Sequence, residues 1–401
     1  SQIISRHLDL QARLLKDRNL GYYSIGSSGH EGNAAISLAF KTTDMAFLHY
    51  RSGAFMIQRA KQYGLSDPIM DQLLSLVASS EDPIAGGRHK VFGSLELFVP
   101  PQTSTIASHL PKSLGAALSI TLSKTLKEAS PFKLPSDSVI LCSFGDGSLN
   151  HATAQTTLNA VGWSLENQTP LPLVFICEDN GLGISVPTPK DWVEKSVSKR
   201  PGWIYLACDG TNVADVYGTA CEAEQLARRK KLPVFIHMKT VRLLGHAGSD
   251  IEFQYRTLTE IEAAEADDPL LHTAHRIRTL DWMKTAEILE VYENIRKQVQ
   301  IRADEAVKRP KLNSFSEIKA SLLPPKKLDV VYKKVSEEAR VLKFGKHYES
   351  IHAPKNMCQS LNTALTDLMI QYPQICLFGQ DVAKKGGVYR VTADLQQRFG
   401  K

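Results

Sequence analysis

Two short apolar runs, each followed directly by glycine and polar residues, constrain the fold of this chain more than any other feature. The run 139–144 (VILCSF) leads into the GDGS segment 145–148, and the run 173–177 (LVFIC) leads into the EDNG segment 178–181. The length and composition of both runs are typical of buried parallel strands. The segment 150–164 between them is rich in Ala, Thr and Leu and predicts a crossover helix. We therefore expect a strand–helix–strand unit here.

The polar residues after the two predicted strands indicate a phosphate site. Ligands of open parallel sheets bind beyond the carboxyl ends of the strands, so Asp146 and Asn180 should lie side by side. Carboxylate and amide oxygens suit Mg²⁺, which keeps coordination positions for phosphate oxygens and water. Gly145 and Gly147 let the backbone approach a phosphate closely. A plain acidic turn is the alternative for the GDG segment alone, but the second polar segment after a second strand favours a diphosphate held through Mg²⁺.

This pattern resembles the thiamine diphosphate motif, in which Gly-Asp-Gly is followed about thirty residues later by Asn-Asn. More narrowly, the chain resembles the decarboxylating component of 2-oxo acid dehydrogenase complexes, in the form with fused alpha and beta halves. The resemblance implies thiamine diphosphate and Mg²⁺ as cofactors, with Asp146, Asn180 and the carbonyl of Leu182 as metal ligands. The chain departs from the motif in two ways. The spacing is a few residues longer, which we attribute to an enlarged loop at 165–172, and Asp179 replaces the first Asn.

The resemblance implies further contacts with the diphosphate. Gly145 and Gly147 belong to the motif itself, and Ser148 directly follows its Gly-Asp-Gly. Tyr50 and Arg51 match the family's Tyr-Arg segment, and a planar guanidinium suits a phosphate. A Tyr-Arg pair on its own is usually surface decoration, so this assignment depends on the resemblance.

Other contacts implied by the family lie further along the chain. Ile106 stands where the family places a bulky apolar side chain that bends the cofactor, although a core isoleucine at a helix start fits equally well. Arg242 and His246 match a family pattern that binds the terminal phosphate, and His246 is implied to be catalytic in acyl transfer to lipoate. We interpret His30, in the loop 26–32, as a surface or capping residue and do not assign it to the site.

The composition is that of an ordinary soluble globular protein, with 43% hydrophobic and 22% charged residues and a net charge of +6. The sequence has no basic stripe with interleaved aromatics and no run of transmembrane length, so we expect neither a nucleic-acid nor a membrane partner. The six cysteines form no Cys-x-x-Cys pair, and two lie in predicted strands. This pattern indicates a reducing compartment, and we expect a cytoplasmic location. Because the first residue is Ser and not Met, the sequence does not decide whether a targeting segment precedes it.

The 401 residues exceed a single typical core. We expect an α/β fold, with a doubly wound parallel sheet and helices on both of its faces over residues 1–265. A helical tail (266–325) and a charged linker (326–354) should follow. Residues 355–401 resemble the opening of the beta half, a pyrimidine-binding α/β domain that is truncated here and that should include a buried strand at 375–378.

The resemblance implies oxidative decarboxylation of a 2-oxo acid, branched-chain or pyruvate, with reductive acylation of the lipoyl domain of a dihydrolipoyl acyltransferase. It also implies a homodimer of the fused chain, equivalent to two alpha and two beta subunits. A transketolase-like enzyme and a non-catalytic regulatory half-protein are the alternatives, and the Arg242–His246 block and the beta-like segment favour the dehydrogenase. In the family, the glutamate that activates the cofactor follows the Phe-Gly that is 399–400 here, so we expect residues 1–401 alone to be inactive.

Overall fold

The computed structural model describes residues 1–88, 92–102, 105–123, 134–324 and 334–400. They form two compact units, each described by itself below. The first comprises Ser1–Ser123 and Leu134–Ser321, and the second includes the chain from Leu322 onward. The predicted linker residues before 334 lie outside the described residues.

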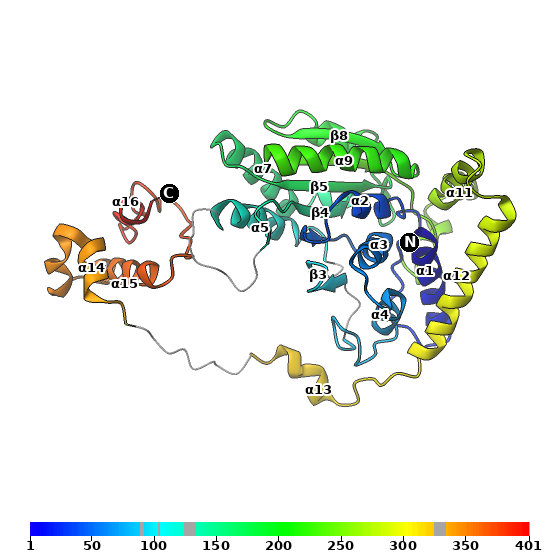
Figure 1. Ribbon diagram of the computed structural model, residues 1–401, viewed down its shortest axis with the longest axis horizontal. Helices are drawn as coiled ribbons and strands as arrows, with labels where there is room; N and C mark the ends of the chain where they lie inside the picture. Colours follow the sequence, from blue (N-terminus) through cyan, green and yellow to red (C-terminus); the bar gives the residue numbers. More distant parts are fainter. Residues whose placement is uncertain (89–91, 103–104, 124–133, 325–333, 401) are drawn as a thin grey trace. The chain divides into compact units, whose positions relative to one another are not determined.

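A five-stranded parallel sheet forms the centre of the first unit (Figure 1). The order is β1-β4-β5-β9-β8, and every neighbouring pair is parallel. The bounds are β1 (Ala46–Phe47), β4 (Ile140–Gly145), β5 (Leu173–Asp179), β8 (Ile204–Asp209) and β9 (Val234–Lys239). The two predicted strands are β4 and β5, paired from Ile140 opposite Leu173 to Gly145 opposite Glu178. The expected α/β fold with a parallel sheet is confirmed.

Helices cover both faces of this sheet. Successive strand residues point to opposite faces, so Leu141 and Val174 enter one core while Cys142 and Phe175 enter the other. Burial on both faces explains why β4 and β5 are almost wholly apolar. The first core is closed by α2 (Asn33–Ala39), α3 (Gly53–Tyr63) and α9 (Val213–Lys230), and the second by α5 (Leu110–Ser123), α7 (Ala152–Glu166) and α8 (Trp192–Val197).

A third apolar cluster joins the N-terminal helix to a helix near the end of the first unit. The two helices lie side by side in Figure 1. Leu8 and Leu15 of α1 (Gln2–Asp17) pack with Leu73 of α4 (Pro68–Leu76) and Ala303 of α12 (Thr285–Ala306). The remaining elements of this unit are β2 (Phe92–Ser94), β3 (Val99–Gln102), α6 (Asp146–Leu149), β6 (Leu182–Gly183), β7 (Val186–Pro187), α10 (Leu258–Ala266), α11 (Pro269–Thr279), α13 (Phe315–Lys319) and the 3₁₀ turn Glu252–Gln254.

The described part of the second unit contains helices joined by turns and irregular segments. Its α-helices are α14 (Glu337–Phe344), α15 (Met357–Gln371) and α16 (Leu395–Phe399), and its 3₁₀ turns are Gly345–His347 and Glu349–His352. Helix α14 lies within the predicted linker and so differs from the expectation. The Ser336 side chain caps it by accepting a hydrogen bond from the Ala339 N–H, and Arg340 pairs with Asp367 of α15 at 2.9 Å. A helix cap and an ion pair thus order a segment whose charge alone suggested a linker.

The strand predicted at 375–378 is not formed. Phe378 is 92% exposed, and no described residue of the second unit lies in a strand. A strand needs a neighbour to satisfy its N–H and C=O groups. The apolar run therefore has no ladder to join within the described residues of this unit.

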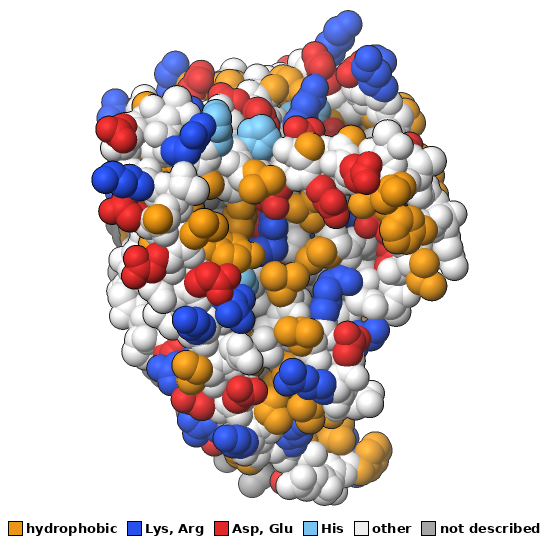
Figure 2. Space-filling view, turned by 90° about the vertical axis from the view of Figure 1, so that its right-hand side faces the viewer, with side chains coloured by type: hydrophobic (Ala, Val, Ile, Leu, Met, Phe, Trp, Pro, Cys, Tyr) orange, Lys and Arg blue, Asp and Glu red, His pale blue; other side chains and the backbone are white. Residues whose placement is uncertain are grey.

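None of the helices in the described ranges combines the length and the apolar composition needed to cross a membrane. On the face seen in Figure 2, Lys and Arg side chains are interspersed with Asp, Glu and hydrophobic side chains rather than gathered into one stripe.

Candidate active site

Strands β4 and β5 end side by side and bring Asp146 and Asn180 to one edge of the sheet. Asp146 is the first residue of α6, directly after β4, and Asn180 directly follows β5. The Asp146 side chain is 1% exposed and accepts a hydrogen bond from the Thr188 hydroxyl. Burial raises the pKa of Asp146, and the Thr188 hydrogen bond only partly opposes this. Its side-chain hydrogen-bond partner, Thr188, carries no charge that would offset this burial.

Leu182, the third predicted metal ligand, lies in β6, which pairs with β7 in a short hairpin. A Cβ added to Gly147 would lie 3.3 Å from Cα of Gly183, so α6 and β6 meet through their backbones. This close approach explains the glycine at 147. Ser148 is buried in the same short helix.

Arg51 and His246 are in direct contact. Arg51 is 2% exposed, and its Nη1 donates to the carbonyl of Gly26 at 2.5 Å. Its Nη2 lies 3.1 Å from Nδ1 of His246. The Arg51 guanidinium also lies 5.2 Å from the centre of the Tyr50 ring, which is 6.3 Å from the His246 ring. Three predicted cofactor contacts thus form one group.

Arg242 is buried and connects this region to the β6–β7 hairpin. Its Nη1 donates to the carbonyl of Ile184 at 2.5 Å, and its Nη2 donates to the Tyr255 hydroxyl at 2.6 Å. Its buried Nε has no hydrogen-bond partner among the described residues. Burial, and then the charges of Arg51 and Arg242, lower the pKa of His246 to about 4. His246 is therefore uncharged near neutral pH.

Ile106 lies in the turn before α5 and is 44% exposed. This exposure argues against the alternative of a core isoleucine at a helix start. Residues 103 and 104 of the same predicted segment lie outside the described residues.

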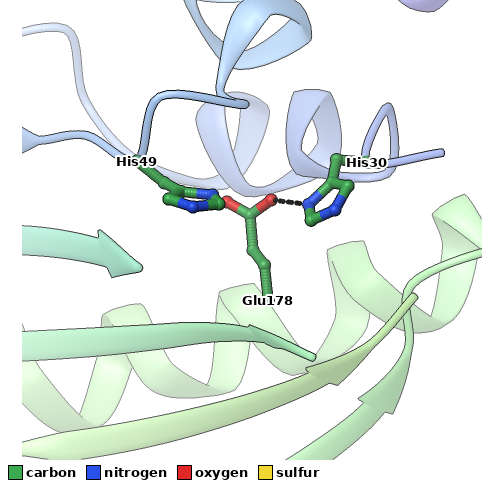
Figure 3. A group of neighbouring side chains, drawn as sticks. All are labelled: His30, His49 and Glu178. Atoms are coloured by element: carbon green, nitrogen blue, oxygen red, sulfur yellow. Dashed lines mark hydrogen bonds and ion pairs between the residues drawn. The ribbon is translucent and has the colours of Figure 1, made fainter. Parts of the chain in front are cut away.

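A buried cluster of two histidines and one glutamate lies at the same edge (Figure 3). Oε2 of Glu178 accepts from Nδ1 of His30 at 2.7 Å, and both side chains are fully buried. His49 lies on the other side of the Glu178 carboxylate. A Cβ atom added to Gly145 would lie 3.3 Å from Nε2 of His49, so the His49 ring packs against the end of β4. Nε2 of His30 lies 3.0 Å from Nδ2 of Asn180. The interpretation of His30 as a surface or capping residue is wrong, because the folded loop turns it inward.

Asp179, which replaces the family's first Asn, is engaged elsewhere. Its Oδ2 lies 2.8 Å from Nε2 of His237, and Nδ1 of His237 lies 2.6 Å from the Tyr205 hydroxyl. Although burial opposes it, the hydrogen bond with His237 lowers the pKa of Asp179. Asp179 therefore connects β5 to β9 through His237.

The sequence analysis missed Glu178, His30, His49 and His237. One signal was available, because Glu178 directly follows the apolar run of a predicted buried strand. A charged side chain in that position needs a buried polar partner. The partner itself could not be inferred, since His30 is 148 positions away.

Residues 1–315 match the dehydrogenase E1 component family. This chain belongs to that family. It is an alpha-type, thiamine diphosphate-dependent 2-oxo acid dehydrogenase E1 component, which confirms the resemblance to the decarboxylating component. Among similar proteins is the mitochondrial 2-oxoisovalerate dehydrogenase subunit alpha of Homo sapiens, 25% identical over 335 residues that cover 81% of this chain and 68% of the relative. The 2-oxoisovalerate dehydrogenase subunit alpha of Bacillus subtilis (strain 168) is 26% identical over 279 residues, covering 68% of this chain and 78% of the relative.

Proposed function

We propose that this E1 component decarboxylates a branched-chain 2-oxo acid on thiamine diphosphate. The observation that carries the proposal is the placement of Asp146 and Asn180 at the ends of neighbouring strands. Beside them, Arg242 is hydrogen-bonded to the β6–β7 hairpin, and Arg51 is hydrogen-bonded to His246. The similar proteins are named 2-oxoisovalerate dehydrogenases, which favours a branched-chain substrate over pyruvate.

The residues at this edge fit a diphosphate held through Mg²⁺. Asp146 offers a buried carboxylate whose side-chain hydrogen-bond partner is the uncharged Thr188 hydroxyl, and Asn180 and Leu182 offer neutral oxygens. Oxygen ligands of this kind suit Mg²⁺, which keeps positions for phosphate oxygens. The buried Arg51 and Arg242 supply positive charge for the phosphates.

When bound, thiamine diphosphate supplies the electron sink that decarboxylation requires. The part of this chain is to hold and orient it and to handle protons. Arg51 must donate to Nδ1 of His246, because a guanidinium has no acceptor. The neutral His246 ring then carries its hydrogen on Nε2, where it can donate a hydrogen bond to a reacting group.

We also propose that the product acyl group passes to the lipoyl domain of a dihydrolipoyl acyltransferase. A further part of the proposal is a homodimer of a chain that carries both alpha and beta halves. Support for the second half comes from the beta-like residues 355–401, which belong to a unit separate from the α/β unit.

The test is a lipoyl-domain acylation assay with the full E1 component, Mg²⁺ and thiamine diphosphate. The substrates are 2-oxoisovalerate, pyruvate and a transketolase donor–acceptor pair. We expect the highest kcat/KM with 2-oxoisovalerate and loss of turnover in the Asp146→Asn variant. Faster acylation from pyruvate would contradict the branched-chain assignment. Sugar transfer without acylation would indicate a transketolase-like enzyme, and cofactor binding without any turnover would indicate a regulatory protein.

A further inference from the structure

His30 connects the side chains of Glu178 and Asn180. Its Nδ1 lies 2.7 Å from Oε2 of Glu178, and its Nε2 lies 3.0 Å from Nδ2 of Asn180. His30 and Glu178 are both completely buried. The chain of hydrogen bonds therefore runs from the interior of the protein to a proposed metal ligand.

Only one arrangement of protons satisfies this chain. A carboxylate accepts, so Nδ1 of His30 must donate to Glu178. An amide nitrogen only donates, so Nε2 of His30 must accept from Asn180. A second contact agrees, because the N–H of Leu182 donates to Oδ1 of Asn180 at 3.1 Å. The amide oxygen thus faces away from His30 and keeps a second lone pair for a cation.

We propose that Glu178 and His30 are positioning residues that hold the Asn180 amide with its oxygen available to the metal. The inference rests on the Mg²⁺ site of the proposed function. An Asn amide turned by half a rotation would present its NH₂ group to the cation, which binds oxygen only. The hydrogen bond from Asn180 to His30 favours the productive orientation before the metal arrives.

The loop that carries His30 is held firmly enough for this task. Gly29 has a φ of +96°, and a Cβ there would lie 2.2 Å from the carbonyl oxygen of Val241, so the backbone packs closely against the segment after β9. Glu31 accepts from the Gly29 N–H and from Nε of Arg6, both at 2.7 Å. These contacts fix the backbone on both sides of His30.

A metal ion bound by His30, His49 and Glu178 is the rival explanation. Two imidazoles and a carboxylate with ligand atoms within 4.8 Å of one another can hold a transition metal. Such an ion would have to break the bond between His30 and Glu178 or the bond between His30 and Asn180, because both ring nitrogens of His30 are engaged. The zinc content of the purified protein is therefore an arm of the test.

The experiment measures Mn²⁺ affinity by electron paramagnetic resonance in the full E1 component at saturating thiamine diphosphate. We expect His30→Leu to weaken Mn²⁺ binding at least tenfold. His30→Gln should restore most of the affinity, since an amide can donate to Glu178 and accept from Asn180. The matched control is His7→Leu, which removes another buried histidine, one packed 4.4 Å from the Tyr292 ring, and should bind Mn²⁺ like the wild type.

In turnover assays, His30→Leu should raise the Mg²⁺ concentration for half-maximal rate more than it lowers kcat at saturating Mg²⁺. Unchanged Mn²⁺ affinity in folded His30→Leu would overturn the positioning role while leaving the Mg²⁺ site intact. Equal losses of Mn²⁺ affinity in His30→Leu and His30→Gln would also overturn it. So would a content of one zinc ion per chain in the wild type that is lost in His49→Leu. Failure of the wild type to bind Mn²⁺ with thiamine diphosphate would instead remove the proposed metal site itself. If His30→Leu does not fold, His30→Asn replaces it, because its side chain is too short to reach both partners.

Discussion

Nη2 of Arg51 lies 3.1 Å from Nδ1 of His246 and donates to the main-chain carbonyl of the same residue at 3.2 Å. The two residues are 195 positions apart and follow different strands of the sheet, β1 and β9. Burial, and then the charges of Arg51 and Arg242, hold the pKa of this imidazole at about 4. Two residues proposed to bind phosphate therefore contribute to the charge state of His246.

Replacing Arg51 by Gln should raise the pKa of His246 from about 4 toward its ordinary value. The physical reason is that a neighbouring positive charge disfavours the imidazolium, and Gln removes that charge. A pH titration of the His246 ring signal by NMR measures the change. Arg51→Lys keeps a positive charge nearby and should give a smaller shift. Identical pKa values in wild type and Arg51→Gln would mean that burial and Arg242 set the value without Arg51.

Replacing Asp146 by Asn should weaken the joint binding of Mg²⁺ and thiamine diphosphate at least tenfold, about 1.4 kcal/mol or more. The variant keeps the size of the buried side chain but removes the charge that faces the cation. Calorimetric titration of the full E1 component measures the affinity. Asp137→Asn is the control, because Asp137 is half-exposed and pairs with Lys41. Unaltered binding by Asp146→Asn would exclude the carboxylate as a metal ligand.

How far the sequence predicted this site depends on how local each feature is. The apolar runs of β4 and β5 are visible in the sequence, and parallel pairing then places Asp146 beside Asn180 without further information. The position of His30 is different, since it requires the loop around Gly29 to pack against the segment after β9. A contact of that kind depends on tertiary packing, which no local pattern encodes.

The same reasoning explains the two differences in the second unit. Helix α14 is stabilised by an ion pair between Arg340 and Asp367, which lies on another helix, so the charge of the segment alone was misleading. The run 375–378 has the composition of a strand, but a strand forms only beside a partner. In both places a neighbour outside the segment contributed to the outcome.

The stability of the protein should fall as the pH drops from about 6.5 to about 4, partly because of His109. This side chain is 3% exposed, its Nε2 lies 2.7 Å from the Ser143 carbonyl oxygen, and its Nδ1 has no partner among the described residues. Burial, and then Lys112, lower the pKa of His109 to about 4, against the effect of the Ser143 hydrogen bond.

The unfolded chain, with an ordinary histidine pKa, therefore takes up this proton first as the pH falls. The contribution of neutral His109 to the free energy of unfolding is therefore fully present above pH 6.5 and declines as the pH falls below it. The loss from His109 between pH 8 and pH 5 should be roughly 2 kcal/mol. Urea unfolding at the two pH values measures the loss, and His109→Gln, which can still donate to Ser143, should show a smaller difference. An equal pH dependence in the variant would assign the effect to other groups.

Replacing Asp179 by Asn should leave metal and cofactor affinity within about twofold of the wild type but lower the free energy of unfolding by roughly 1 kcal/mol. This change restores the family's Asn-Asn pair. In this chain, however, Asp179 accepts from His237 at 2.8 Å and from the Gly181 N–H at 3.0 Å, so its charge serves the connection between strands. An amide oxygen can keep these contacts but gives a weaker bond than a carboxylate. Calorimetry of Mg²⁺ and thiamine diphosphate binding, together with urea unfolding, separates the two effects. A tenfold loss of Mg²⁺ affinity in Asp179→Asn would show that the carboxylate of Asp179, and not only Asn180, contributes to the metal site.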